Sequence, residues 1–193
     1  LACRYGEMQD DAVILTTVLE HHSNQLPWRK GCQVDYVKAR FPCGMLDFAD
    51  LKEKLDQYAG RVKLVAVTGA SNITGLVMPI HEIAEIVHAH GARILVDAAQ
   101  LSAHHPVDMG RPDDAGHIDF LAFSAHKMYA PFGSGGLIGP RSFFEESEPV
   151  VVGGGAVDLV TLDDVEWAEA PDREEAGTPN LFGIYALACA VDA

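Results

Sequence analysis

One lysine, Lys127, stands where a reactive amine could be built. It directly follows an apolar run, 118–123, that reads as a strand, and a glycine-rich turn, 133–136, comes soon after it. A lysine that forms a Schiff base must reach a pocket and be desolvated enough to lose its proton. The neighbours Ser124 and His126 could bind a phosphate, and the glycines let backbone approach a ligand closely. The alternative is a lysine buried in a salt bridge, and the residue types leave both readings open.

Two more polar side chains stand at the ends of predicted strands. Asn72 follows the run 62–68, and Asp97 closes the run 93–97. Ligands of open α/β sheets lie beyond the carboxyl ends of the strands, so Asn72, Asp97 and the segment 124–127 form a candidate site. Strand ends also carry ordinary helix and turn caps, which is the plainer interpretation of the same positions.

The strands that position these residues are short apolar runs separated by helical patterns. Such alternation is typical of an α/β protein with a mainly parallel sheet. The segment 104–117 and the acidic segment 158–175 read as irregular. The predicted strands are 12–19, 33–38, 62–68, 93–97, 118–123 and 136–139, the second of them more exposed than the others.

Helix signals lie between these runs. Asp47 predicts the N-cap of a helix that continues to Tyr58. Pro79 opens a second helix at its favoured first-turn position, and Gly91 closes it. A further helix begins near Leu181. We find no internal repeat and no low-complexity segment.

The charge balance excludes some classes of partner. The 193-residue chain has 28 acidic and 14 basic side chains, a formal net charge of −14. Nucleic-acid affinity is built on clustered Lys and Arg, so no nucleic-acid partner is expected. No apolar run approaches the roughly 18–20 residues needed to span a bilayer. Residues 1–10 lack the pattern of a secretory signal, so we expect a cytoplasmic protein without a membrane partner.

The four cysteines are scattered along the chain. They form no C-x-x-C pair and have no histidine at metal-ligand spacing, so the sequence predicts reduced thiols that serve packing, and no metal site. They are Cys3, Cys32, Cys43 and Cys189.

The segment Ile118–Lys127, followed by Gly133-x-Gly135-x-Leu137, resembles the lysine signature of class V aminotransferases, fold-type I enzymes that use pyridoxal 5′-phosphate (PLP). Other segments are similar to the cysteine desulfurase and selenocysteine lyase branch. They occur in the family's order and cover nearly the whole chain. These segments are 20–28, Ser71-Asn72 with Gly75, 96–100, 104–108, 153–155 and 175–180.

The resemblance implies a three-layer α/β/α fold, the large domain of an aspartate aminotransferase-like PLP enzyme, and a role for each candidate residue. Lys127 would carry PLP as a Schiff base and shuttle a proton between substrate and cofactor carbons. Asp97 would pair with the ring nitrogen and keep it protonated, so that the ring acts as an electron sink. His21 would stack on the ring face and could act as acid or base.

The remaining roles concern the periphery of the cofactor. Asn72 and Gln100 would form hydrogen bonds around the phenolic oxygen of the ring. Ser124 and His126 would contact the phosphate. Thr178 would reach the phosphate of the neighbouring subunit, which implies a homodimer. The three other histidines of the motifs are expected to make hydrogen bonds within loops; they are His22, His104 and His105.

The resemblance also implies what residues 1–193 lack. They are expected to be a trimmed PLP-binding large domain, with the N-terminal phosphate loop lying upstream of Leu1–Gly6. The C-terminal small domain would carry the arginine for the substrate carboxylate and the cysteine that accepts sulfur. No cysteine of this chain lies in a matching context, so none is assigned as catalytic. For the chain alone we expect weak or absent PLP binding and no full turnover.

Several functions fit these expectations. The first is a PLP lyase that releases sulfur or selenium from cysteine or selenocysteine, leaves alanine, and passes sulfur to an acceptor protein. An aminotransferase, an epimerase or a kynureninase-like hydrolase shares the fold, and a non-catalytic dimerising scaffold would be a folded, colourless dimer. A nucleotide-binding α/β domain would need a glycine-rich loop after the first strand, and residues 16–24 contain no glycine.

Overall fold

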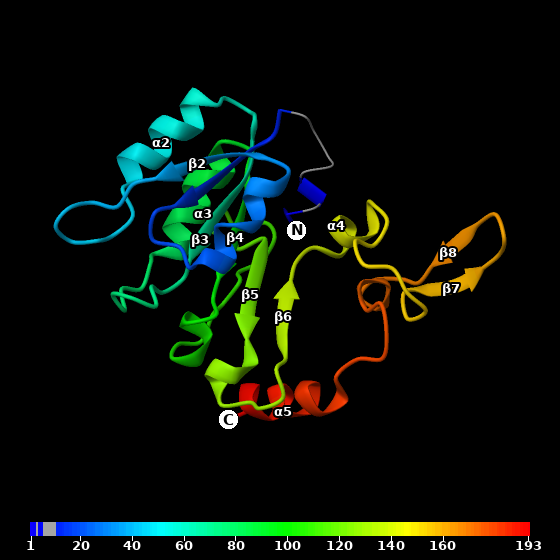
Figure 1. The fold of residues 1–193 in the computed structure, drawn as a ribbon. Coiled ribbons are helices and arrows are strands. Elements are labelled where there is room, and N and C mark those ends of the chain that lie inside the picture. The colour runs from blue at the N-terminus through cyan, green and yellow to red at the C-terminus, as the bar shows by residue number, and fades with distance from the viewer. Residues whose placement is uncertain (3, 6–10) are drawn as a thin grey trace.

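A six-stranded sheet forms the centre of the computed structural model, which describes residues 1–2, 4–5 and 11–193 (Figure 1). Its strand order is β2-β1-β3-β4-β5-β6. The first five strands run parallel, and β6 pairs antiparallel with β5. The strands are β1 (Val13–Thr17), β2 (Gln33–Val37), β3 (Val62–Thr68), β4 (Arg93–Asp97), β5 (Phe120–Ser124) and β6 (Gly135–Ile138).

Both faces of the sheet are covered, as a parallel sheet requires. Helices α2 (Phe48–Gln57) and α3 (Ile80–Ala89) cover one face with the side chains of Leu51, Leu55 and Ile83. The other face packs against Trp28 and Phe143, among others. Trp28 lies in the 3-10 helix η2 (Pro27–Lys30), and Phe143 in α4 (Arg141–Glu145). The chain therefore forms the three layers expected of the α/β/α class.

Helix α5 (Leu181–Val191) lies across the carboxyl end of the sheet, below β5 and β6 in Figure 1. It packs against the 3-10 helix η4 (Ala125–Met128), which follows β5. Ser134 Oγ donates a hydrogen bond of 2.8 Å to the carbonyl oxygen of Gly183. The structure also has three more 3-10 helices: η1 (His22–Asn24), η3 (Leu101–Ala103) and η5 (Asp172–Glu174).

The acidic segment expected to be irregular contains a hairpin instead. Strands β7 (Val157–Val160) and β8 (Val165–Trp167) pair antiparallel and project away from the sheet (Figure 1). Thr161 closes the turn of this hairpin, since its Oγ1 accepts a hydrogen bond of 2.9 Å from the backbone N–H of Asp164. The sequence expectation was wrong here because both strands are short and largely exposed, so little hydrophobic periodicity marks them.

The predicted strands and helices are otherwise present, with their ends shifted by a few residues. Asp47 caps α2, since its Oδ1 accepts hydrogen bonds from the backbone N–H groups of Ala49 and Asp50. No helix in the described part of the chain has the length and apolar character needed to cross a bilayer.

The packing role expected for the cysteines holds for one of them. Cys32 is half-buried and packs against the core, whereas Cys43 and Cys189 are exposed, so the packing role predicted for those two was wrong. Cys3 lies outside the described residues, as does Gly6 at the end of the segment 1–6 on which the upstream phosphate loop was argued.

Candidate active site

The strand register brings the candidate residues to one edge of the sheet. In the register of the parallel strands, Thr68 of β3 pairs with Asp97 of β4, and Asp97 pairs with Ala122 of β5. All three strands are parallel, so the residues that follow them meet at the same edge. Asn72, Asp97 and the segment 124–127 are those residues, as predicted.

Asp97 is held in a rigid turn. Its Oδ1 accepts a hydrogen bond of 3.0 Å from the backbone N–H of Ala99, and its carbonyl oxygen accepts one of 2.8 Å from Gly69. The next residue, Ala98, donates to the carbonyl oxygen of Ala122 at 2.8 Å. The carboxyl group is thus both a turn cap and a half-buried acid at the strand end, so the two readings of Asp97 are compatible.

Lys127 lies in η4, the tight turn that follows β5. The turn is anchored by Ala125, whose backbone N–H donates to the carbonyl oxygen of Ser134 at 3.0 Å, and it ends at Tyr129 with a φ of 62°. Ser124 and Lys127 are half-buried and His126 is exposed. Among the described residues Lys127 forms no ion pair, so they do not supply the salt bridge of the alternative reading.

A hollow of about 500 Å³ lies beside these turns. Asn72 and Gln100 both line it, so the structure brings together the two amides that were predicted to act as a pair. His104 and His105, which were expected only to make loop hydrogen bonds, are exposed and line the same hollow. Lys127 and Asp97 are not among its lining residues.

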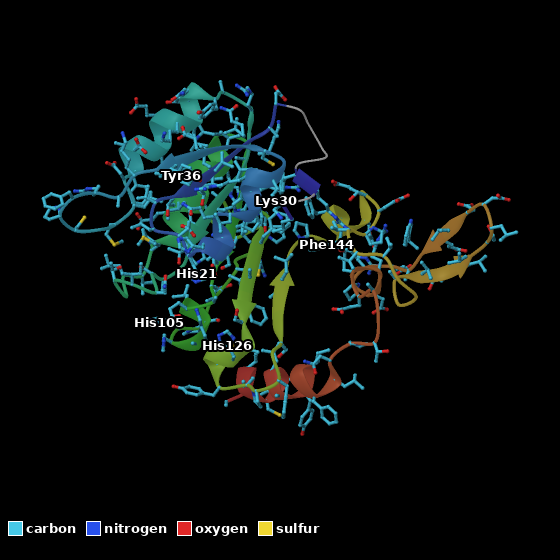
Figure 2. The ribbon with its side chains drawn as sticks, in the orientation of Figure 1. His21, Lys30, Tyr36, His105, His126 and Phe144 are labelled. Carbon is cyan, nitrogen blue, oxygen red and sulfur yellow. The ribbon has the colours of Figure 1, made fainter. Side chains whose placement is uncertain are left out.

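His21 belongs to the same end of the molecule. Figure 2 shows His21, His105 and His126 toward the end of the sheet at which β5 terminates. The His21 side chain is exposed, and its Nδ1 lies 2.7 Å from Ser23 Oγ. The adjacent 3-10 helix η1 packs against β3, which places His21 near the strand that leads to Asn72.

A polar network that the sequence reasoning missed lies under His21. The Glu20 carboxylate accepts hydrogen bonds from Thr17 Oγ1 at 2.6 Å, Asn24 Nδ2 at 2.6 Å and the Thr68 backbone N–H at 2.8 Å. Burial raises the pKa of Glu20 to about 7, although these three hydrogen bonds oppose the shift. The negative charge of Asp97 also raises the pKa of Glu20, so the two carboxyl groups interact electrostatically.

The sequence does carry a signal for this network. Glu20 and Asn24 both belong to the segment 20–28, and Thr17 and Thr68 end the strands β1 and β3. Threonines that end neighbouring apolar strands, close to a Glu with an Asn four residues later, could have indicated a buried carboxyl group.

Thr178 lies apart from the other candidates. It is exposed, precedes α5, and is not among the residues that line the hollow. The nearby Asn180 fixes this segment: it caps α5 through the backbone N–H of Gly183 at 3.0 Å and donates to the carbonyl oxygen of Phe132 at 2.6 Å. Within one chain the structure therefore does not bring Thr178 together with Asn72 and Gln100.

Comparisons with known proteins find cysteine desulfurases among the relatives of this chain. The chain is 37% identical over 200 residues to a probable cysteine desulfurase of Halalkalibacterium halodurans, which covers 100% of this chain and 47% of the relative. The apo structure of a cysteine desulfurase from Thermococcus onnurineus NA1 matches with a TM-score of 0.85 and 36% identity, over 97% of this chain and 46% of that one.

A more distant structure is C-DES with glycine covalently linked to its PLP cofactor. It matches with a TM-score of 0.78 and 25% identity, over 99% of this chain and 52% of that chain. This chain thus spans about half the length of the relatives it matches. The model of the aminotransferase class-V family matches residues 2–193. The chain belongs to the aminotransferase class-V family.

Proposed function

We propose that this chain is most of the PLP-binding large domain of an enzyme that releases sulfur from cysteine, or selenium from selenocysteine. The observation that carries the proposal is the register that sets Asp97 on the strand next to the one leading into Lys127, with both residues at the carboxyl edge of the sheet. The relatives named cysteine desulfurase supply the substrate class.

The residues at this edge fit PLP by their chemistry. The amine of Lys127 matches the aldehyde of PLP, and the carboxylate of Asp97 matches its ring nitrogen. The amides of Asn72 and Gln100 match the phenolic oxygen. The Glu20 carboxyl, whose pKa of about 7 reflects burial, adds a group that is partly neutral near neutral pH beside Asp97.

When bound, PLP supplies an electron sink for the negative charge that develops on a substrate carbon. Lys127 holds the cofactor through Nζ, and the same amine moves a proton to and from the substrate. Asp97 keeps a proton on the ring nitrogen. Both residues stand on rigid elements, one in an anchored turn and the other at the end of a buried strand, so their positions need no reorganisation.

The surrounding side chains would bind and orient the cofactor. His21 covers a face of the ring, and Asn72 with Gln100 holds the phenolic oxygen. Ser124 and His126 bind the phosphate. Thr178, which is exposed and lies outside the hollow, serves the phosphate site of a second copy in a homodimer. The sulfur removed from the substrate passes to an acceptor, which is consistent with this open, exposed edge.

Cofactor attachment is tested first and separately from turnover. The chain is incubated with PLP, reduced with borohydride, digested and mapped by mass spectrometry. We expect the label at Lys127, in low yield because the chain alone is expected to bind PLP weakly. Lys127→Ala should abolish the label, whereas Lys52→Ala, at an exposed lysine of α2, should leave it unchanged. Label spread over surface lysines in both variants would contradict the cofactor site.

Turnover is tested in the whole enzyme to which this domain would belong, because the chain alone is expected to give no full turnover. Cysteine or selenocysteine is added with a thiol reductant, and sulfide, selenide and alanine are measured. The proposal predicts alanine in equal amount to the released chalcogen, and no keto acid. A keto acid with transfer of the amino group would show an aminotransferase instead, and a racemised amino acid would show an epimerase. A labelled Lys127 with no product from any of these substrates in the whole enzyme would retain the cofactor site and refute the desulfurase reaction.

A further inference from the structure

A second cluster of chemically capable side chains lies at the opposite edge of the sheet from Lys127. His88 stands in the last turn of α3, and His117 and Asp119 lie just before β5 begins, at its amino end (Figure 1). One ligand atom from each of these three half-buried residues lies within 4.8 Å of the others. Asp119 belongs to the segment that resembles the lysine signature, but none of the three residues has been assigned a role in the candidate active site.

The hydrogen bonds of the two imidazoles fix where their protons are. His88 Nδ1 lies 2.6 Å from the carbonyl oxygen of Ala115, and His117 Nδ1 lies 2.7 Å from that of Asp114. A carbonyl oxygen only accepts, so both Nδ1 atoms must carry hydrogen. In a neutral imidazole the lone pair is then on Nε2.

Both Nε2 atoms point at one carboxylate. His88 Nε2 lies 2.9 Å from Asp119 Oδ2, and His117 Nε2 lies 3.5 Å from Asp119 Oδ1. Two neutral rings would therefore direct lone pairs at negative oxygens. Two protonated rings would instead stack as cations, with centroids 4.2 Å apart. One protonated ring would satisfy the carboxylate but leave the lone pair of the other ring facing it, whereas a single divalent cation between the three groups satisfies all of them.

The surroundings have the features of a metal-ligand outer shell. A histidine that binds a metal through Nε2 usually donates its other N–H to a carbonyl or carboxylate, as both histidines do here. The carboxylate is also oriented, because Asp119 Oδ2 accepts a hydrogen bond of 2.8 Å from the backbone N–H of Ile94.

The loop that carries His117 is wound tightly onto α3. Gly110 has a φ of +72°, and a Cβ there would lie 3.3 Å from His117 Cα. A Cβ on Gly116 would lie 3.2 Å from the carbonyl oxygen of His81. A side chain at Gly116 would crowd α3, so the glycine favours the close approach of the loop that carries His117 to the helix that carries His88.

We propose that His88, His117 and Asp119 bind one Zn²⁺ ion that joins α3 to the start of β5. Two imidazoles and a carboxylate suit Zn²⁺, with water as the fourth ligand. Two ligands of a tetrahedral Zn²⁺ lie about 3.4 Å apart, so a side-chain adjustment of about 1 Å closes the site. The ion would stabilise the fold at the edge away from the candidate active site.

The test uses the full chain, without a histidine tag, after treatment with EDTA. Zn²⁺ is titrated calorimetrically, and Tm is followed with and without the metal. We expect one ion per chain, a rise in Tm, and the visible absorption of four-coordinate Co²⁺ when Co²⁺ replaces Zn²⁺. Co²⁺ ligated by nitrogen and oxygen lacks the sulfur charge-transfer band that thiolate binding at Cys43 or Cys189 would give.

Variants identify the ligands. His88→Gln, His117→Gln and Asp119→Asn should each weaken Zn²⁺ binding by about tenfold or more. The matched control is His81→Gln, because His81 is also on α3 and its Nδ1 lies 2.8 Å from the carbonyl oxygen of Gly116. It should bind Zn²⁺ as the unchanged chain does.

Asp119→Asn keeps an oxygen for the Ile94 N–H, so it separates loss of the ligand from loss of the fold. The metal-free Tm of each variant provides the same check. Absence of Zn²⁺ binding, or equal binding in all the variants, would overturn the proposal. In that case a shared proton would hold the cluster as a His–Asp ion pair, and metal would leave Tm unchanged.

Discussion

The Glu20 carboxylate and the backbone N–H of Thr68 lie 2.8 Å apart, and their hydrogen bond ties the loop after β1 to the end of β3. Glu20 Oε1 also accepts from Thr17, at the end of β1. The buried carboxyl group therefore joins the ends of two central strands directly under His21. A side chain that was not among the candidate residues thus supports the loop that carries one of them.

Glu20 predicts a pH dependence of stability. Its pKa in the folded chain, about 7, lies above the usual 4.5 because of burial. Folding therefore favours the protonated acid, and this contribution is fully present below about pH 4.5 and is lost as the pH rises through about 7. Between about pH 5 and about pH 8 the unfolding free energy should fall by about 2 kcal/mol from this group.

The comparison of Glu20→Gln with the unchanged chain isolates that effect, since other titrating groups are common to both. Urea unfolding at the two pH values should show a smaller fall in the variant. Asn24 can rotate its amide to present an oxygen to the new Gln. The exposed Glu53→Gln of α2 is the control and should retain the full dependence. An unchanged pH dependence of the unfolding free energy in Glu20→Gln would show that folding does not raise the pKa of Glu20.

Asp97→Asn should separate chemistry from structure. The variant keeps the oxygen that caps the Ala99 N–H, so its unfolding free energy should change by less than about 1 kcal/mol. In the whole enzyme, loss of the charge beside the ring nitrogen should lower kcat/KM for the desulfurase reaction by about a hundredfold or more. The matched control is Asp108→Asn, because Asp108 Oδ1 caps the backbone N–H of Gly110 in the same way. Equal activity in the two variants would remove Asp97 from the site.

Gly135→Ala should disturb the turn that carries Lys127. Gly135 pairs with Ser124, and a Cβ at this position would lie 2.6 Å from the carbonyl oxygen of Phe123. Backbone must then move, so we expect a loss of about 1–3 kcal/mol in unfolding free energy, together with weaker PLP attachment. Gly154→Ala, where a Cβ meets nothing within 4 Å, is the control for chemical denaturation. Equal stability in both variants would contradict the close approach of β5 and β6.

Asp47→Ala tests the helix cap. Its carboxylate accepts from two backbone N–H groups at the start of α2, at 3.0 and 3.3 Å. Removing it should cost about 1 kcal/mol of unfolding free energy, measured by denaturant titration. The exposed Asp56→Ala, near the other end of the same helix, should cost clearly less. If Asp47→Ala costs no more unfolding free energy than Asp56→Ala, water has replaced the hydrogen bonds of the cap.

Local patterns in the sequence determined most of the secondary structure. The apolar runs that became β1, β3, β4 and β5 are buried on both faces of a parallel sheet, and such strands are recognisable without neighbours. Caps such as Asp47 mark helix ends because they satisfy backbone groups within a few residues. The positions of Asp97 and Lys127 after strands were equally visible, and the family resemblance was carried by motifs of this local kind.

Tertiary structure decided what depends on contacts between distant residues. Burial raises the pKa of Glu20, against the opposing effect of the hydrogen bond from Thr68, 48 residues away in the sequence. His88 meets Asp119 across 31 residues, so no ligand spacing revealed the cluster. The hairpin at 157–167 was missed because its strands are short and exposed. Propensity and capping act over a few residues, whereas burial and charge interactions depend on which segments the fold brings together.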